Sequence, residues 1–314
     1  MKPLNTNRME LNLDVSGHTH ATVRPGLVAT FYLNGYSAPV CAAIADAIEI
    51  YFSVVPRTQM KSYLGSNGWY KEINSRVITK DINSLRKLPS GYDGYIFNYS
   101  SEPYGQVGSY GVYVRAMEVS DIWPKRASLL RLEFPLEIVE TIGEDAFVNL
   151  IQQVAAVLPI HCGTAGLAFK RASAMEDESI QFIGVLLKRY LGFDPCEFLF
   201  AYTILNHTYS AHWLNILSSD LMTTLGGPDQ LNKTSPNAHL WSNKNCYVIR
   251  ASRLPPAGDV HTGAKDLGTI PSIARFLQPR RLTEFRRMWD NLAISPDQWF
   301  ARFDDLQDTD WDNS

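Results

Sequence analysis

The stretch from His212 to Leu282 constrains the fold more than any other part of the chain. In order, it predicts a short apolar helix, a glycine stop, an apolar strand, a loop stiffened by proline and glycine, and a second helix end, at residues 213–217, 226–227, 246–251, 255–260 and 276–281. The loop holds a single acid, Asp259. No reaction requires these residues at these spacings, so the stretch indicates a rigid platform rather than a catalytic centre.

The first regular elements lie near the N-terminus. An apolar and β-branched run at 27–33 predicts a buried strand, and Asn34-Gly35 turns the chain after it. Pro39 stands where the first turn of a helix would begin. That helix places apolar residues three and four positions apart, which predicts one face packed on the core: Val40, Ile44, Ile48, Tyr51 and Val55.

The middle of the chain predicts an α+β fold with largely antiparallel or mixed sheets and packed helices. Strands at 95–99 and 112–117 are joined by the glycine-rich loop 102–111, which is typical of a long hairpin. Sequential antiparallel strands need no crossover, so a doubly wound sheet is disfavoured. Further strands are predicted at 129–134 and 163–169, and further helices at 144–158 and 177–191. The strand–helix pairing at 27–55 recurs at 129–158, which leaves a duplicated α/β unit open.

The chain contains no linker rich in proline or serine, so we expect one compact domain over residues 25–304. Two lobes meeting near residue 125 or 195 remain an alternative. Residues 1–24 form a polar segment that we expect to pair only loosely, and residues 305–314 form an acidic tail. Before the tail, a helical stripe at Leu282, Phe285, Trp289 and Leu292 precedes a capping box at Ser295–Gln298.

Composition excludes several classes of protein. Hydrophobic residues make up 45% and charged residues 19% of 314 residues, which is ordinary for a globular chain with an ample core. The formal charge of −3 is too small to indicate a general nucleic-acid or membrane-surface binder. Four widely spaced cysteines form no metal or disulfide pattern, so we expect reduced, mostly buried thiols. Without a secretory or membrane-spanning segment, the chain is predicted to be cytoplasmic.

No catalytic, cofactor-binding or metal-binding constellation emerges from the motifs. Phosphate-binding glycine loops and a nucleophile elbow are missing from the sequence. Gly163-Thr164-Ala165-Gly166 precedes a strand rather than a helix, which favours close backbone packing over anion binding. His161 and Cys162 are neighbours on a predicted strand, so their side chains would point to opposite faces. Glu133, Glu137 and Glu140 could supply an acid/base pair, but two of them flank a strand end before a predicted helix start, where acids are favoured by the helix dipole alone.

Charge is distributed unevenly near the C-terminus. Residues 275–287 hold five arginines against one glutamate, and residues 301–314 hold five aspartates against one arginine. Both runs are compatible with solvated surfaces, while the second could also offer an acidic surface to a basic partner. The candidate partner-binding residues combine these acids with aromatic residues of the hairpin loop and the tail: Tyr104, Tyr110, Asp304, Asp305, Asp308, Asp310, Trp311 and Asp312.

Several ordered segments of the chain resemble the type VI secretion immunity proteins of bacteria. They are Arg24-Pro25-Gly26-Leu27, Leu132-Glu133-Phe134-Pro135, Gly163-Thr164-Ala165-Gly166-Leu167-Ala168, Trp213-Leu214-Asn215-Ile216-Leu217, Leu225-Gly226-Gly227, Val248-Ile249-Arg250-Ala251, Pro256-Ala257-Gly258-Asp259-Val260 and Trp299-Phe300-Ala301-Arg302-Phe303-Asp304. The resemblance spans about residues 24–304. It departs from the family at the irregular region 60–110, at Thr262-Gly263 and after Asp304.

The resemblance implies a non-enzymatic protein that binds and neutralises a cognate toxin, for some relatives a nuclease, by covering its active or substrate-binding cleft. It implies no cofactor and no catalytic residue, because the family motifs read as packing and turn determinants. We expect the toxin to be the partner, with no direct nucleic-acid or membrane binding, and self-association is left open. An adaptor that loads the toxin onto the secretion machinery and an unrecognised hydrolase are the alternatives.

Overall fold

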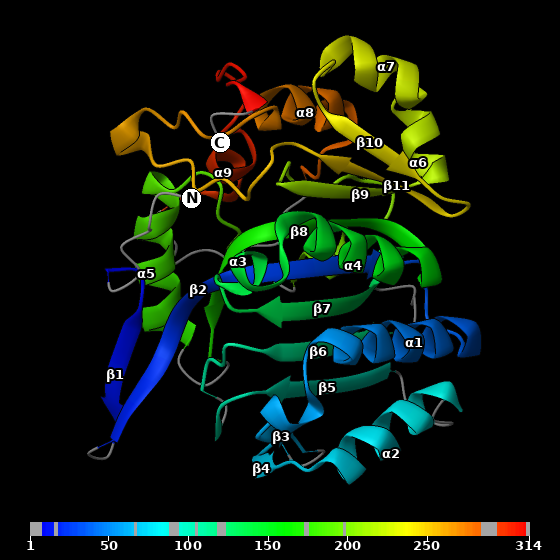
Figure 1. Ribbon diagram of the computed structural model, residues 1–314, viewed down its shortest axis with the longest axis vertical. Helices are drawn as coiled ribbons and strands as arrows, with labels where there is room; N and C mark the ends of the chain where they lie inside the picture. Colours follow the sequence, from blue (N-terminus) through cyan, green and yellow to red (C-terminus); the bar gives the residue numbers. More distant parts are fainter. Residues whose placement is uncertain are drawn as a thin grey trace.

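The computed structural model describes residues 8–15, 18–65, 68–87, 94–103, 106–117, 124–172, 176–196, 199–283 and 294–311. Within these residues, helices pack on one large sheet whose eleven strands pair antiparallel to one another (Figure 1). The predicted α+β class with a largely antiparallel sheet is confirmed.

The sheet runs in the order β10-β11-β9-β8-β2-β7-β6-β5-β3-β4, and β1 pairs with β2 beside this path. Its strands are β1 (Leu11–Val15), β2 (His18–Leu33), β3 (Ser62–Leu64), β4 (Tyr70–Glu72), β5 (Gly94–Ser100), β6 (Gly111–Met117), β7 (Ser128–Phe134), β8 (Ile160–Arg171), β9 (Leu214–Ser218), β10 (His239–Ser242) and β11 (Cys246–Arg250). The sixteen-residue β2 is the central strand, because β1, β7 and β8 all pair with it.

The helices are α1 (Ala38–Val54), α2 (Ser75–Arg86), α3 (Ile138–Ile142), α4 (Glu144–Val157), α5 (Glu176–Arg189), α6 (Ser219–Thr224), α7 (Gly227–Thr234), α8 (Ile270–Leu277) and α9 (Pro296–Phe300). Between these elements, the described residues also form short 3-10 helices at Arg57–Gln59, Leu199–Tyr202, Val260–Thr262 and Gln278–Arg280. Helices α1 and α4 lie side by side over the sheet, with α2 next to α1 (Figure 1). The predicted stripe of α1 is buried throughout, and Tyr51 Oη also donates a hydrogen bond of 3.0 Å to Glu133 O of β7.

One predicted element is wrong. Residues 213–217 were expected to form a short helix, but 214–218 form β9, which pairs with β8 and β11. A short run of apolar residues fits a buried helix and a buried strand equally well, so pairing with neighbouring strands decides between them. The buried Asn215 is accommodated because its side chain bonds to the main-chain N–H and C=O of His212 at 2.9 and 2.8 Å. The glycine pair at 226–227 does stop a helix, namely α6, and both glycines have positive φ.

The polar N-terminal segment is paired more regularly than expected. β1 forms an antiparallel ladder with the first part of β2, and residues 18–24 continue directly into the central strand. The ladders β6–β7 and β8–β9 join the segments on either side of residues 125 and 195, where two lobes were left open. The division into lobes and the duplicated unit stay predictions.

The glycines at 163 and 166 allow close packing inside the sheet, as the sequence indicated. A Cβ on Gly163 would lie 2.6 Å from Thr30 O of the neighbouring strand. One on Gly166 would lie 2.7 Å from Nδ1 of the buried His212. Because real Cβ atoms do not approach other atoms this closely, larger residues at either position would displace their neighbours.

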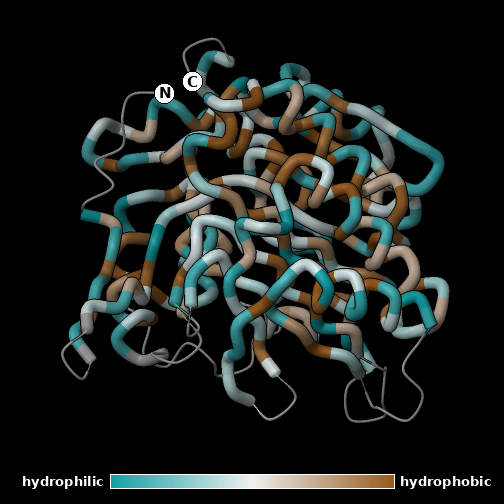
Figure 2. The backbone as a smooth tube through the Cα atoms, turned by 60° about the horizontal axis from the view of Figure 1, so that its bottom comes forward, coloured by the Kyte–Doolittle hydropathy of each residue, from teal (hydrophilic) through white to brown (hydrophobic). Residues whose placement is uncertain are grey.

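The C-terminal residues fold back over α8. The predicted capping box at Ser295 and Gln298 is present at the start of α9. Beyond α9, the Thr309 N–H donates to Gly268 O at 2.9 Å, and the Gly268 N–H donates to Thr309 Oγ1 at 2.7 Å. The predicted stripe at Phe285, Trp289 and Leu292 lies outside the described residues. Hydrophilic segments lie along much of the periphery of the molecule (Figure 2).

Candidate partner-binding surfaces

Two of the predicted partner contacts, Asp304 just before the tail and Asp308 within it, hold the last residues of the chain to the fold. Asp304 accepts two hydrogen bonds from the Arg281 guanidinium, with Nη1–Oδ1 at 2.6 Å and Nη2–Oδ2 at 2.7 Å. Asp308 Oδ1 accepts the main-chain N–H of Ser272 at 2.9 Å, at the first turn of α8. Paired carboxylates of this kind offer less free charge to a partner. Their role in partner binding stays a prediction.

Trp311 also packs on the protein. Its ring stacks on His239 of β10, with centroids 4.2 Å apart and the planes inclined by 8°. The guanidinium of Arg250 lies 5.7 Å from the Trp311 centroid, and its Nη1 donates to Asp145 Oδ1 at 2.7 Å. The stacked indole therefore links the end of the chain to β10, β11 and α4.

The other candidate residues differ in how far they are exposed. Asp305 and Asp310 are exposed, whereas Tyr110 is half-buried against the core at the end of the hairpin loop. Two hydrogen bonds between Tyr110 and Ser101 close that loop. The Tyr110 N–H donates to Ser101 Oγ at 3.1 Å, and the Ser101 N–H donates to Tyr110 O at 3.0 Å. Tyr104 and Asp312 lie outside the described residues.

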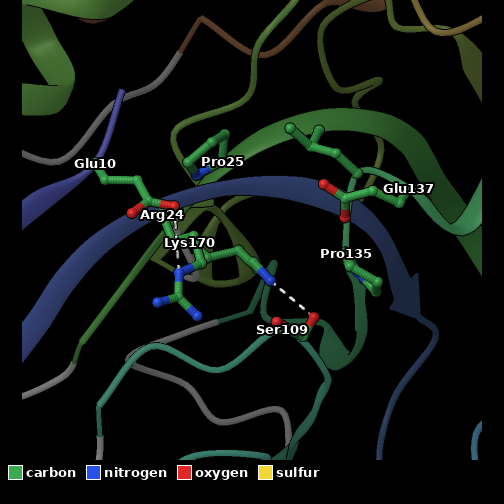
Figure 3. Close-up of a pocket in the computed structure, with 8 residues that line it drawn as sticks. Glu10, Arg24, Pro25, Ser109, Pro135, Glu137 and Lys170 are labelled. Atoms are coloured by element: carbon green, nitrogen blue, oxygen red, sulfur yellow. Dashed lines mark hydrogen bonds and ion pairs between the residues drawn. The ribbon is translucent and has the colours of Figure 1, made fainter. Parts of the chain in front are cut away.

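A buried lysine forms the base of a pocket that the sequence did not indicate (Figure 3). Lys170 on β8 is 1% exposed, and its Nζ donates to the main-chain oxygens of Gly108 and Ser109 at 2.7 and 2.8 Å. Burial lowers the pKa of Lys170 to about 8, although the negative charge of Glu133 opposes this. The lysine thus fastens the β5–β6 loop to the central strands. No local signal marks it, since Lys170 comes directly after the apolar run 163–169, a position where many lysines are solvated.

Two of the family-like segments meet at this pocket. Gly26 leaves room for the lysine, because a Cβ there would lie 2.5 Å from Lys170 Cε and 2.7 Å from Phe134 O. Pro25 and Pro135 line the pocket. Its rim carries Glu10, Arg24 and Glu137, with Arg24 Nε 3.5 Å from Glu10 Oε1. The interpretation of these motifs as packing determinants agrees with this arrangement.

A second pocket lies between α3 and the turn at residues 254–255. Its walls are apolar and its rim is acidic, with the lining residues Leu136, Val139, Glu140, Gly143, Glu144, Leu167, Leu254 and Pro255. Glu144 is engaged, since Arg253 Nε lies 3.0 Å from its Oε1. Glu140 is exposed in the first turn of α3 and has no cation within ion-pair distance among the described residues. Leu136 lines this pocket and the Lys170 pocket, so the two are neighbours.

Asp194 and His212 form a buried pair of ionisable residues next to β8. His212 Nε2 is 3.5 Å from Asp194 Oδ2, and Asp194 Oδ1 accepts the Cys196 N–H at 2.6 Å. Burial lowers the pKa of His212 below its ordinary value, against the opposing effect of Asp194. His212 is 2% exposed and Asp194 9%. His212 packs against Gly166, since a Cβ on that glycine would lie 2.7 Å from His212 Nδ1.

The other chemical features of the described residues are structural. All four cysteines are free and buried, as predicted, and burial raises the pKa of each thiol. His161 Nε2 lies 2.9 Å from His207 O. Asp259 is fixed by Arg189 through two contacts of 2.8 and 3.1 Å. Within the described ranges, no group of three His, Cys, Asp or Glu residues could hold a metal ion, and no helix is long and apolar enough to cross a membrane.

Comparison with known proteins identifies the family. The model of the TsiV family, described as type VI immunity for VRR-NUC, matches residues 44–303. The chain belongs to this family. The resemblance seen in the sequence is confirmed, and the protein is a type VI immunity protein against a VRR-NUC nuclease toxin rather than an enzyme.

The fold of this immunity protein has a solved relative. The Pseudomonas aeruginosa T6SS protein PA0821 superposes with a TM-score of 0.75 at 17% sequence identity, covering 94% of this chain and 87% of its own. At this identity, the likeness concerns the fold alone. None of the curated proteins matches the chain.

Proposed function

We propose that this immunity protein protects the cell that makes it by binding its cognate VRR-NUC toxin directly and covering the surface through which the toxin takes up nucleic acid. The family match over residues 44–303 carries the proposal. A nuclease must bind the phosphate backbone, and proteins do so with lysine and arginine. A protein that covers such a surface needs exposed carboxylates and a rigid frame, and it needs no catalytic group.

The molecule offers both a rigid frame and exposed carboxylates. The sheet and the helices packed on it form a frame with an extensive apolar core. The Asp194–His212 pair is largely buried, at 9% and 2% exposure, so it adds little to the surface open to a partner. Exposed acids include Glu137 and Glu140 at α3 and Asp305 and Asp310 near the C-terminus. Stable complexes of this kind bury about 1,200–2,000 Å² in total.

The site of action follows from the target. A nuclease toxin harms a cell where its nucleic acid lies, so the inhibitor is useful in the cytoplasm. We therefore propose that the protein meets its toxin there, after delivery of the toxin or during its synthesis. The acidic tail and the hairpin-loop tyrosines, Tyr104 and Tyr110, remain proposed contacts.

Co-expression with the toxin and a binding assay test the proposal together. We expect the protein to rescue growth of cells that express the active toxin and to form a stable 1:1 complex with a nuclease-inactive toxin. Nucleic acid should compete with complex formation, because both ligands use the same basic surface. Rescue without any complex would favour an enzyme that repairs or destroys a product, and binding without rescue would favour a loading adaptor.

A further inference from the structure

We propose that the apolar pocket between α3 and residues 254–255 receives a lysine or arginine side chain from the nucleic-acid-binding surface of the toxin. Glu140 and the neighbouring Glu137 would meet the charge of that side chain. This proposal rests on the function proposed above and specifies where the complex is anchored.

The shape and lining of the pocket fit the stem of such a side chain. Val139 and Leu167 are buried, whereas Leu136 and Leu254 are partly exposed. Their side chains, with Pro255, form walls that water solvates poorly. Long basic side chains bury their methylene groups along such walls and keep the charged head at the rim. A purely apolar side chain would leave the carboxylates of the rim unpaired in the interface.

The charges at the rim fit the head group. Glu140 lies in the first turn of α3, and Glu137 is the residue just before that helix; both are exposed, and their spacing of three residues places them on one side of it. No described cation lies within ion-pair distance of either carboxylate, whereas Glu144 is already paired with Arg253 and Glu10 with Arg24. The unpaired acidic charge beside this pocket is therefore that of Glu140, which lines it, and of Glu137, which lines the neighbouring Lys170 pocket. An interface cation placed between them would gain two charge-assisted contacts.

The same features disfavour other occupants. A nucleic acid would be repelled by the two unpaired carboxylates. The nuclease toxin, in contrast, is the partner that the family description implies, and its nucleic-acid-binding surface must be rich in lysine and arginine. Charge complementarity therefore selects the toxin.

Titration of a nuclease-inactive toxin into variants of the full-length protein tests the proposal. We expect Glu137→Lys/Glu140→Lys to weaken the complex by at least about tenfold and to reduce its salt dependence. Leu136→Trp, which fills the pocket without changing charge, should weaken it by a similar factor. The matched control is Glu72→Lys, which reverses an exposed charge on β4, away from α3 (Figure 1), and should change affinity by less than about twofold.

Each result has one meaning. If the wild-type protein forms no complex with the toxin, the proposed function itself fails. If it forms the complex and the double reversal binds equally well, the pocket proposal is overturned and the proposed function stands. An equal loss for Glu72→Lys would show a general effect of net charge and would also overturn the pocket proposal. Circular dichroism confirms that each variant is folded.

Discussion

At the scale of the residue, Lys170 shows how much a tertiary environment can change a common side chain. Its Nζ lies among main-chain oxygens, with no carboxylate within ion-pair distance among the described residues. A buried ammonium group without a counter-ion is costly, which explains its lowered pKa. The three main-chain contacts, the third to Phe134 O at 3.5 Å, offset part of that cost by holding the β5–β6 loop. Lys170 therefore holds the β5–β6 loop against the central strands.

We expect the free energy of unfolding of the wild type to rise relative to that of Lys170→Met between pH 8 and pH 10.5. The folded pKa of about 8 lies below the ordinary value of 10.5, so in this window the unfolded chain holds a proton that the folded chain has lost. Unfolding then takes up a proton, and stability increases with pH. Below pH 8 both states are protonated and the difference should level off. Urea unfolding of both proteins across this range measures the effect.

The control for this titration is Lys71→Met, because Lys71 is exposed on β4. Its stability difference from the wild type should not vary with pH over the same range. A difference between wild type and Lys170→Met that is also independent of pH would contradict the lowered pKa.

At the scale of the element, the last residues of the chain behave as part of the α8 unit rather than as a free tail. Leu306 O accepts a hydrogen bond from Arg275 Nη1 at 2.9 Å, and Asp308 caps the Ser272 N–H. Thr309 and Trp311 add the contacts to Gly268 and His239. The aspartates that make this segment acidic therefore have different roles, because some are bound internally and others face solvent.

Truncation after residue 305 should lower the melting temperature by roughly 5 °C, because it removes these contacts and exposes the surface of α8. Asp305→Asn, a change at an exposed position, should leave the melting temperature unchanged. Differential scanning calorimetry compares the two. A truncated protein as stable as the wild type would show that the segment contributes nothing to the fold.

At the scale of the whole molecule, one continuous sheet sets the order of local stability. β2 pairs on both sides with strands that carry the apolar core, and α1 and α4 lie side by side over the sheet. β4 and β10 stand at the two ends of the strand order and are short. Elements with few buried contacts open at lower free energy than central ones.

Hydrogen exchange should therefore be slowest in β2, β7 and β8 and fastest in β4 and β10. Mass spectrometry of deuterium uptake in the free protein resolves this order. Earlier exchange in β2 than in β10 would contradict the central role of β2. Adding the nuclease-inactive toxin should slow exchange at α3 if the pocket beside it is covered, and β4 serves as the reference element there.

The sequence alone determined the elements whose signals are local. The stripe from Val40 to Val55 fixed a helix and its buried face, and Ser295 and Gln298 fixed the start of another. The ordered motifs also resemble the family whose model matches residues 44–303. Periodicity and capping depend on neighbours within a few residues, so they can be read without the fold.

Only the tertiary structure decided the rest. Residues 214–218 are a strand because β8 and β11 pair with them, and Lys170 is buried because Gly26 makes room for it. The pocket beside α3 exists because a turn more than a hundred residues later in the chain closes it. Each of these depends on contacts between segments distant in the chain, and no local pattern encodes which distant segment will supply a partner, a wall or a charge.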